Sequence, residues 1–228
     1  MNVPLHVSTA NVAKLIGEGA RAQMLLSLLS GRALTAGELA GRANVSPQTA
    51  SAHLSQLVEG GLLALEKQGR HRYYRLASAD VARAIESLMA LTPQVSLSDT
   101  PTSLEPIHFA RTCYDHLAGR LGVAVTDGLV EKGWLEPTGK NYDLTSEGEM
   151  GFEGLEINVT SLRKQRRQFA RQCLDWTERR HHLAGALGAA VTQTMFERKW
   201  MFKQEGSRTV HLTQAGQKGL STVLGVRL

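Results

Sequence analysis

The feature that most restricts how this chain can fold is an internal repeat in its C-terminal half. Two blocks of seven residues occur twice, in the same order and with closely similar side chains. A repeated unit of this size buries its apolar face most readily against a second copy. The repeats, residues 109–157 and 169–226, are therefore predicted to pack on each other with approximate twofold symmetry. The matching blocks are FARTCYD at 109–115 with FARQCLD at 169–175, and HLAGRLG at 116–122 with HLAGALG at 182–188.

Each copy is predicted to form two helices, a short polar hairpin and a closing helix capped by threonine. Apolar side chains recur every four residues from Phe109 to Leu121, a spacing typical of the buried face of a helix. On such a helix, Cys113 and His116 would lie one turn apart with their side chains on the same side. The second copy carries six additional residues, 176–181, between its two blocks.

A stretch rich in proline, serine and threonine precedes the first repeat. Residues 93–106 hold three of the six prolines of the chain. Each proline removes an amide donor and biases the preceding residue away from helix, so this stretch is predicted to be a linker. It would separate an N-terminal domain, residues 1–92, from a C-terminal domain, residues 107–228.

Two short helices of the N-terminal domain carry clear start signals. Thr35 and Glu38 have the spacing of a capping box, and Ser46 followed by Pro47 begins a second helix. This second helix is apolar on one side, whereas its outer side is small, polar and uncharged. A solvated surface would carry Glu and Lys, so the outer side suits a helix that enters the major groove of DNA. The outer residues are Ser46, Gln48, Thr49, Ser51 and His53.

A basic hairpin follows, with apolar strands on either side of a tip that holds Lys67, Arg70 and Arg72 within six residues. Such a wing can lie along the phosphate backbone, with an arginine able to enter the minor groove. Ser78 then caps a helix that runs to Leu91 and is apolar on one face. A helix of this kind is predicted to form a dimer seam, and a dimer reads two half-sites about one DNA turn apart.

Three blocks of the N-terminal domain resemble, in order and separation, the ArsR/SmtB family of winged-helix repressors. The resemblance covers residues 15–91. It implies a homodimer that occupies a double-stranded DNA operator until an effector releases it. It places the outer residues of the second helix in recognition positions and Arg70 and Arg72 on the wing. The blocks are GxxLTxxELA from Gly31, VSxxTxSxHLxxLxxxGL from Val45 and GRxxYYxL from Gly69.

The expected fold class is mainly α with small β-hairpin wings (α+β), a winged helix-turn-helix followed by two packed helical or winged repeats. Metal-sensing members of the family carry a cysteine pair on the helix corresponding to residues 38–43, and this chain has none there. Other members place Asp and His ligands after the wing, but here Asp80 is followed by no histidine before Leu91. The usual metal sites of the family are therefore not expected.

The repeats offer a different set of candidate effector residues: Cys113, His116, Cys173 and His182. The last two are the repeat counterparts of the first two, so the pairs could face each other across the approximate twofold axis. Thiolate and imidazole suit zinc or another borderline-soft divalent metal. A thiol pair near arginines could instead react with oxidants or electrophiles. An apolar pocket for a small-molecule effector, or plain packing of the cysteines in the core, are the other interpretations.

The densest positive charge in the chain lies at residues 163–167, followed by Arg171, Arg179 and Arg180. One interpretation is a solvated helix face. The other is additional phosphate contact beside the operator, which would steepen the salt dependence of binding.

Composition narrows the class of protein. The net charge of +5 permits binding to nucleic acid. No apolar run approaches the roughly 18–20 residues of a membrane helix, no signal peptide is visible, and two cysteines suit a reducing compartment. A cytoplasmic protein without a membrane partner is expected.

Catalytic fingerprints are missing from the sequence, which has no phosphate-binding glycine loop, no nucleophile elbow and no zinc-protease motif. The prediction is therefore a sequence-specific transcriptional regulator and not an enzyme. The alternatives are a sequence-indifferent architectural DNA-binding protein and a Cys/His-dependent enzyme.

Overall fold

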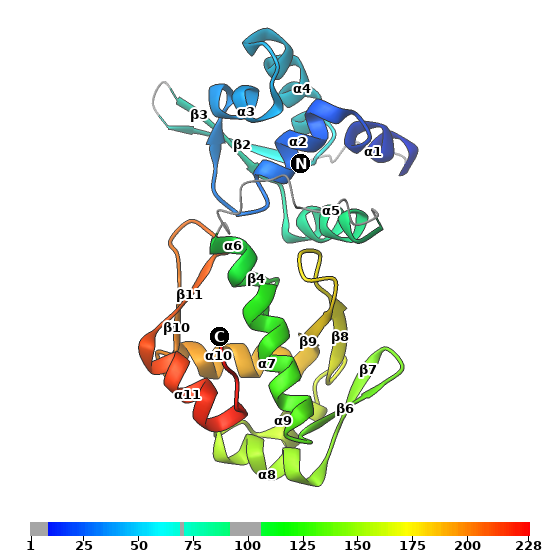
Figure 1. The fold of residues 1–228 in the computed structure, drawn as a ribbon. Helices are drawn as coiled ribbons and strands as arrows, with labels where there is room; N and C mark the ends of the chain where they lie inside the picture. The colour runs from blue at the N-terminus through cyan, green and yellow to red at the C-terminus, as the bar shows by residue number, and fades with distance from the viewer. Residues whose placement is uncertain (1–8, 69–70, 92–105) are drawn as a thin grey trace. The chain divides into compact units, whose positions relative to one another are not determined.

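The computed structural model describes residues 9–68, 71–91 and 106–228. The chain divides into two compact units, Met1–Leu88 and Met89–Leu228, which we call the N-terminal and C-terminal units (Figure 1). The predicted linker lies outside the described residues apart from Pro106, and so does Arg70 of the wing. Among the described residues, no helix is long and apolar enough to span a membrane.

The N-terminal unit is a winged helix-turn-helix. Its strands form one antiparallel sheet in the order β1-β3-β2, and the β2–β3 hairpin is the wing. The elements are α1 (Thr9–Ile16), α2 (Gly19–Ser27), β1 (Leu34–Thr35), α3 (Ala36–Ala43), α4 (Pro47–Glu59), β2 (Leu63–Gln68), β3 (His71–Leu76) and α5 (Ala79–Leu91).

Local capping sets the angle between α3 and α4. Thr35 and Glu38 form the predicted capping box at the start of α3, and the Ser46 hydroxyl accepts a hydrogen bond from the Thr49 amide at the start of α4. Between the two helices, Asn44 adopts the left-handed conformation with φ of 52°, which asparagine tolerates better than most residues. The predicted inner side of α4 is buried through Ala50, Leu54 and Leu57.

The C-terminal unit consists of two copies of one motif, and each copy runs hairpin, helix, hairpin, helix. The first copy contains β4 (Arg111–Cys113), β5 (His116–Ala118), α7 (Gly119–Glu131), β6 (Leu135–Thr138), β7 (Asn141–Leu144) and α8 (Ser146–Gly154). The second contains β8 (Arg171–Leu174), β9 (His181–Ala184), α10 (Gly185–Glu197), β10 (Met201–Lys203), β11 (Val210–Leu212) and α11 (Gln214–Leu224). Two short helices, α6 (Pro106–Phe109) and α9 (Val159–Arg163), precede the respective copies.

The predicted first helix of each repeat is wrong, because a β-hairpin occupies that place. Cys113 and His116 are partners in the antiparallel register of β4 and β5 and do not lie one helical turn apart. Only two residues separate them, and Tyr114 turns the chain with a left-handed φ of 62°. A two-residue hairpin loop needs this positive φ to match the twist of its strands.

The two copies hold each other through a reciprocal pair of hydrogen bonds. The Thr126 hydroxyl on α7 accepts from the Leu183 amide of the second copy at 2.8 Å. The Thr192 hydroxyl on α10 accepts from the Leu117 amide of the first copy at 2.9 Å. Each hydroxyl also donates to a carbonyl one turn earlier in its own helix. The helix of each copy is thus bonded to the first hairpin of the other copy. Buried apolar residues of both copies form one hydrophobic core.

Candidate DNA-binding surface and candidate metal centre

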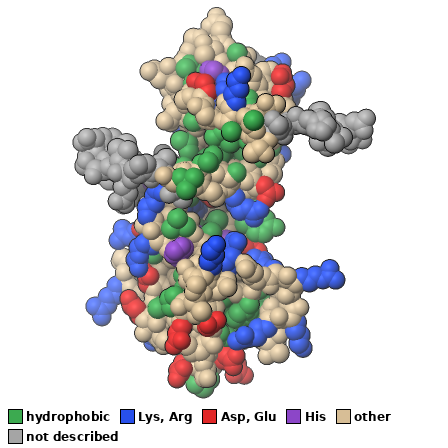
Figure 2. All heavy atoms as spheres, turned by 90° about the vertical axis from the view of Figure 1, so that its right-hand side faces the viewer, with side chains coloured by type: hydrophobic (Ala, Val, Ile, Leu, Met, Phe, Trp, Pro, Cys, Tyr) green, Lys and Arg blue, Asp and Glu red, His purple; other side chains and the backbone are tan. Residues whose placement is uncertain are grey.

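The outer face of α4 is open and polar. Ser46, Gln48, Thr49 and Ser51 are all exposed, and the hydroxyls of Ser46 and Thr49 lie 2.9 Å apart. In Figure 2, uncharged surface dominates the end of the N-terminal unit where Figure 1 places α4. These short side chains donate and accept hydrogen bonds without repelling phosphates, as a helix in the major groove requires.

His53 differs from the other four predicted recognition residues. Its Nδ1 atom lies 3.3 Å from the Arg21 guanidinium, and its Nε2 atom lies 3.7 Å from the Glu18 carboxylate. The side chain is only 17% exposed. The imidazole therefore contacts α2 and is less open than the other four side chains, and base reading by His53 stays a prediction.

Arg21 is a residue that the sequence analysis missed. Its buried guanidinium donates to the Leu15 carbonyl at 2.8 Å and to the Gln56 side-chain carbonyl at 2.8 Å. These bonds tie α1, α2 and α4 together. The sequence offered one sign of this role, because Arg21 lies on the same helical face as the apolar residues Met24 and Leu25. A charged side chain on such a face is expected to be buried and hydrogen-bonded.

On the wing, Lys67 and Arg72 are register partners and both are exposed. Arg75 pairs loosely with Glu66 at 3.9 Å. The described part of the wing thus carries cations that face solvent and can meet a phosphate backbone.

In the C-terminal unit, the structure brings together all four predicted effector residues. One ligand atom from each of Cys113, His116, Cys173 and His182 lies within 4.8 Å of the others, and we call these residues the Cys/His cluster. Each hairpin contributes one register pair, Cys113 with His116 and Cys173 with His182. The two imidazole rings have centroids 5.1 Å apart. The repeat symmetry that was read from the sequence is what makes the two pairs converge.

Burial and hydrogen bonding give the Cys/His cluster an unusual electrostatic state. A hydrogen bond with Cys173 and burial raise the pKa of the Cys113 thiol to about 11. Within the described residues, Nε2 of His116 and both ring nitrogens of His182 are buried without a hydrogen-bond partner. Buried polar atoms without partners are rare in native proteins, and a bound ion or water is one explanation for them.

A carboxylate stands behind each histidine. Asp175 Oδ2 lies 3.5 Å from His182 Nδ1, and Asp115 Oδ1 lies 3.4 Å from His116 Nδ1. Asp175 is fully buried, and both of its carboxylate oxygens accept from Nη2 of Arg111 at 2.9 Å, whereas Asp115 is partly exposed and pairs with Arg167. Because both Nδ1 atoms face carboxylates, the Nε2 atoms are the ones left to face the thiols.

Two of the four cations in the basic stretch at 163–167 are paired with carboxylates. Arg163 pairs with Glu149 at 3.3 Å and Arg167 with Asp115 at 2.5 Å, and farther along the chain Arg180 pairs with Asp127 at 2.8 Å. This pairing favours the interpretation as a solvated surface over extra phosphate contacts.

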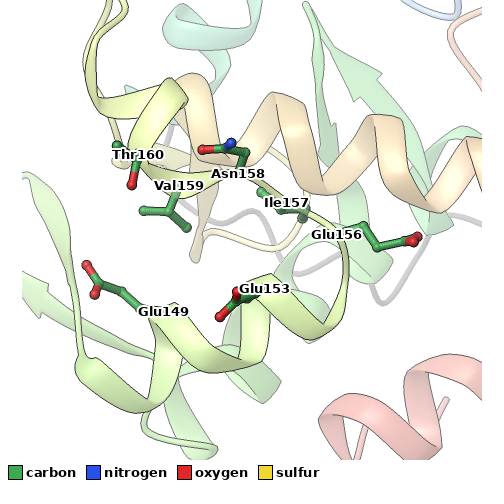
Figure 3. A pocket seen from close by; sticks show the side chains of 7 residues that line it. All are labelled: Glu149, Glu153, Glu156, Ile157, Asn158, Val159 and Thr160. Carbon is green, nitrogen blue, oxygen red and sulfur yellow. The ribbon is translucent and has the colours of Figure 1, made fainter.

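A pocket of about 470 Å³ lies between α8 and α9 and is lined by acidic and small side chains (Figure 3). Its carboxylates are Glu149, Glu153 and Glu156, of which Glu149 pairs with Arg163 and Glu156 with Arg198. The acidic lining disfavours DNA, and the pocket shares no residue with the Cys/His cluster.

A winged helix-turn-helix with a polar recognition face and a basic wing defines a DNA-binding protein of the class that regulates transcription. Residues 16–66 match the helix-turn-helix domain family. The chain is 45% identical over 226 residues to the uncharacterised HTH-type transcriptional regulator YdfF of Bacillus subtilis, covering 98% of this chain and 100% of that protein. The chain therefore belongs to the family of HTH-type transcriptional regulators, as the sequence analysis predicted.

Two further comparisons each cover about a third of this chain. The HTH-type transcriptional regulator Rv0324 of Mycobacterium tuberculosis is 43% identical over 75 residues, which is 32% of each chain. The solved winged helix-turn-helix domain of a possible ArsR-family regulator from Mycobacterium bovis, described as a homodimer, is 35% identical. That match covers 35% of this chain and 72% of the other, with a TM-score of 0.32.

Proposed function

We propose that this transcriptional regulator is a homodimeric, sequence-specific repressor whose operator binding is controlled by a thiophilic divalent cation in the C-terminal unit. The open polar face of α4 supports sequence reading by Ser46, Gln48, Thr49 and Ser51. The resemblance to ArsR/SmtB repressors supports a dimer, with α5 as the seam. Leu88 and Leu91 on α5 are 44% and 80% exposed, as apolar residues at such a seam would be in a single chain.

The single observation that carries the metal proposal is the convergence of two thiols and two imidazoles with buried, unpartnered ring nitrogens. In a tetrahedral zinc site the ligand atoms lie about 3.3–3.8 Å apart. The four atoms already lie within 4.8 Å of one another, so each side chain needs to move inward by less than about 1 Å. A set of two sulfur and two nitrogen ligands selects zinc or a similar borderline-soft ion.

When bound, the ion would supply four bonds that join the hairpin of one repeat to the hairpin of the other. Thiol-based redox sensing is the second candidate, because the two thiols are neighbours. The partnerless imidazoles favour the metal, since disulfide formation would leave them as they are. Neither candidate involves the acidic pocket between α8 and α9.

The test of the metal proposal is titration of the reduced protein with Co²⁺ and Zn²⁺, followed by operator binding with and without Zn²⁺. Co²⁺ reports thiolate ligands and tetrahedral geometry through its absorption. We expect one ion per chain and a change in operator affinity of at least about tenfold, a coupling of about 1.4 kcal/mol. Cys113→Ser and Cys173→Ser should bind operator normally and lose the response, whereas His211→Ala, outside the cluster, should behave as wild type.

Absence of metal binding by the reduced protein, together with loss of operator binding after peroxide joins Cys113 to Cys173, would contradict the metal proposal and favour redox sensing. A normal change of operator affinity on Zn²⁺ addition in both serine variants would show that the cysteines only pack in the core.

The DNA proposal has its own test. Gln48→Ala and Thr49→Ala should reduce discrimination between operator variants by about 1–3 kcal/mol at the positions they read. Arg72→Ala should weaken binding to all DNA nearly equally and lower the salt slope by about one. We predict the same uniform loss for Arg70→Ala. Unchanged specificity in the α4 variants would contradict the recognition role, and equal affinity for unrelated competitor DNA would favour the architectural alternative.

A further inference from the structure

The residues behind His182 form a continuous buried chain that leads away from the Cys/His cluster. Asp175 Oδ2 faces His182 Nδ1 at 3.5 Å. Both carboxylate oxygens of Asp175 accept from Arg111 Nη2 at 2.9 Å, and Arg111 Nη1 donates to the Ile107 carbonyl at 3.2 Å. Ile107 belongs to α6, the first described element after residues 92–105, through which the chain continues from the N-terminal unit.

Several groups hold the Asp175 carboxylate. Besides Arg111, the Gly119 amide donates to Oδ2 at 2.7 Å, and the Thr177 hydroxyl donates to Oδ1 at 2.6 Å. Asp175 and Arg111 are 0% and 1% exposed. His182 Nδ1 lies 3.5 Å from Oδ2 and makes no hydrogen bond to it.

Metal-ligating histidines almost always donate the other ring N–H to a carboxylate or carbonyl, which fixes the ring. An ion held at Nε2 of His182 would favour a ring orientation in which Nδ1 donates to Asp175, the carboxylate that Arg111 also binds.

The first repeat supplies a contrast. Asp115 stands behind His116 in the same way, at 3.4 Å, but its partner is the partly exposed Arg167. Arg111 bonds the Ile107 carbonyl of α6, whereas both hydrogen bonds described for Arg167 are to Asp115. The six additional residues of the second copy cause the difference, because Trp176 covers the Arg111 guanidinium at 4.6 Å and Thr177 holds it at 3.3 Å.

We propose that Asp175 positions His182 for the metal and that Arg111 links Asp175 to α6, so that metal occupancy of the Cys/His cluster changes how firmly α6 is held. The proposal rests on the proposed function, in that the four residues bind a metal. It deepens that function by naming the route from the ion to the segment that joins the two units in sequence.

The main test is Arg111→Lys in the full chain, with Arg167→Lys, the arginine that pairs with Asp115, as the control. Lysine keeps the charge beside Asp175 but offers a single nitrogen in place of the two, Nη1 and Nη2, with which Arg111 bonds Ile107 and the carboxylate separately. We expect Arg111→Lys to bind Co²⁺ within about threefold of wild type, because His182 and Asp175 are retained. Hydrogen exchange of the peptide 106–112 should slow on Zn²⁺ binding in wild type and in Arg167→Lys, and this slowing should be at least about fivefold smaller in Arg111→Lys.

A second variant tests the positioning role directly. Asp175→Asn should weaken Co²⁺ binding by about 10–100-fold. Should either variant fail to fold, Thr177→Val, which removes only the hydroxyl that bridges Arg111 and Asp175, should reproduce a smaller loss of the α6 response.

The outcomes distinguish failure of the coupling between Asp175, Arg111 and α6 from failure of the metal site itself. Zn²⁺ binding in wild type, with equal slowing of exchange at α6 in wild type and Arg111→Lys, overturns the coupling route and leaves the metal site intact. Unchanged Co²⁺ affinity in folded Asp175→Asn overturns the positioning role. Failure of wild type to bind either ion overturns the proposed metal function, and the inference falls with it.

Discussion

Asp175 combines complete burial with a full negative charge. Burial alone raises the pKa of the carboxyl group, but the Arg111 charge and the hydrogen bonds from Thr177, Gly119 and Glu178 outweigh burial and hold the pKa well below its usual range. A carboxyl group whose pKa is lowered by folding stabilises the folded state above its unfolded pKa of about 3.9. That contribution is lost as the pH falls from there toward the folded pKa.

Asp175→Asn is therefore expected to destabilise the C-terminal unit by about 3–5 kcal/mol at neutral pH, because it leaves Arg111 buried without its partner. The difference from wild type should stay constant above about pH 5 and shrink below about pH 4. Urea unfolding followed by tryptophan fluorescence measures it, since all three tryptophans lie in the C-terminal unit. Asp115→Asn is the control, with an expected loss of at most about 1 kcal/mol. A difference that persists undiminished at pH 3 would contradict the assignment.

At the residue scale, the four members of the Cys/His cluster could be predicted because the repeat pairs them in the sequence. The role of Asp175 could not be predicted from the sequence. Its repeat counterpart, Asp115, is partly exposed, whereas the fold of the six additional residues, 176–181, buries Asp175. The contacts of His53 could not be predicted for a similar reason, since helical spacing cannot show that Arg21 and Glu18 lie beside its ring.

Among the elements, the exchanged bonds of Thr126 and Thr192 hold helix to hairpin across the two repeats. Thr126→Val and Thr192→Val each leave a buried backbone amide without an acceptor. Each should destabilise the C-terminal unit by about 1–3 kcal/mol, measured by the same fluorescence-detected urea unfolding. Thr138→Val is the control, because the Thr138 hydroxyl bonds Asp143 at the exposed surface, and its effect should stay within about 0.5 kcal/mol. Losses below that size in both buried variants would show that the exchange does not hold the repeats together.

The helix-turn-helix elements were predictable because their signals are local: a capping box, a serine cap and a proline in the first turn. The first hairpin of each repeat could not be predicted from the sequence, because its apolar residues follow a helical spacing. The turn depends on Tyr114 in a left-handed conformation, and tyrosine is not a residue that signals a positive φ.

For the whole molecule, metal binding should stabilise one unit and not the other. At a Zn²⁺ concentration 100 times the dissociation constant, linkage adds about 2.7 kcal/mol to the unit that holds the ion. We expect the tryptophan-detected transition of the C-terminal unit to move to higher urea and to return on addition of a chelator. Hydrogen exchange of peptides from α2 to α4 should report no stabilisation of the N-terminal unit. The Cys113→Ser variant should remove the shift, and a shift that survives in this variant would place the ion elsewhere.

The first hairpin of each copy presents one thiol and one imidazole, so a chain with a single copy of the motif would hold half a coordination sphere. Such a chain could complete the sphere only by meeting another molecule, and its metal loading would then depend on how much protein the cell makes. With both copies in one chain, the second half-sphere is present at a high effective concentration, fixed by covalent connection and independent of expression level. Because the motif is duplicated within the chain, metal binding would not depend on the protein concentration.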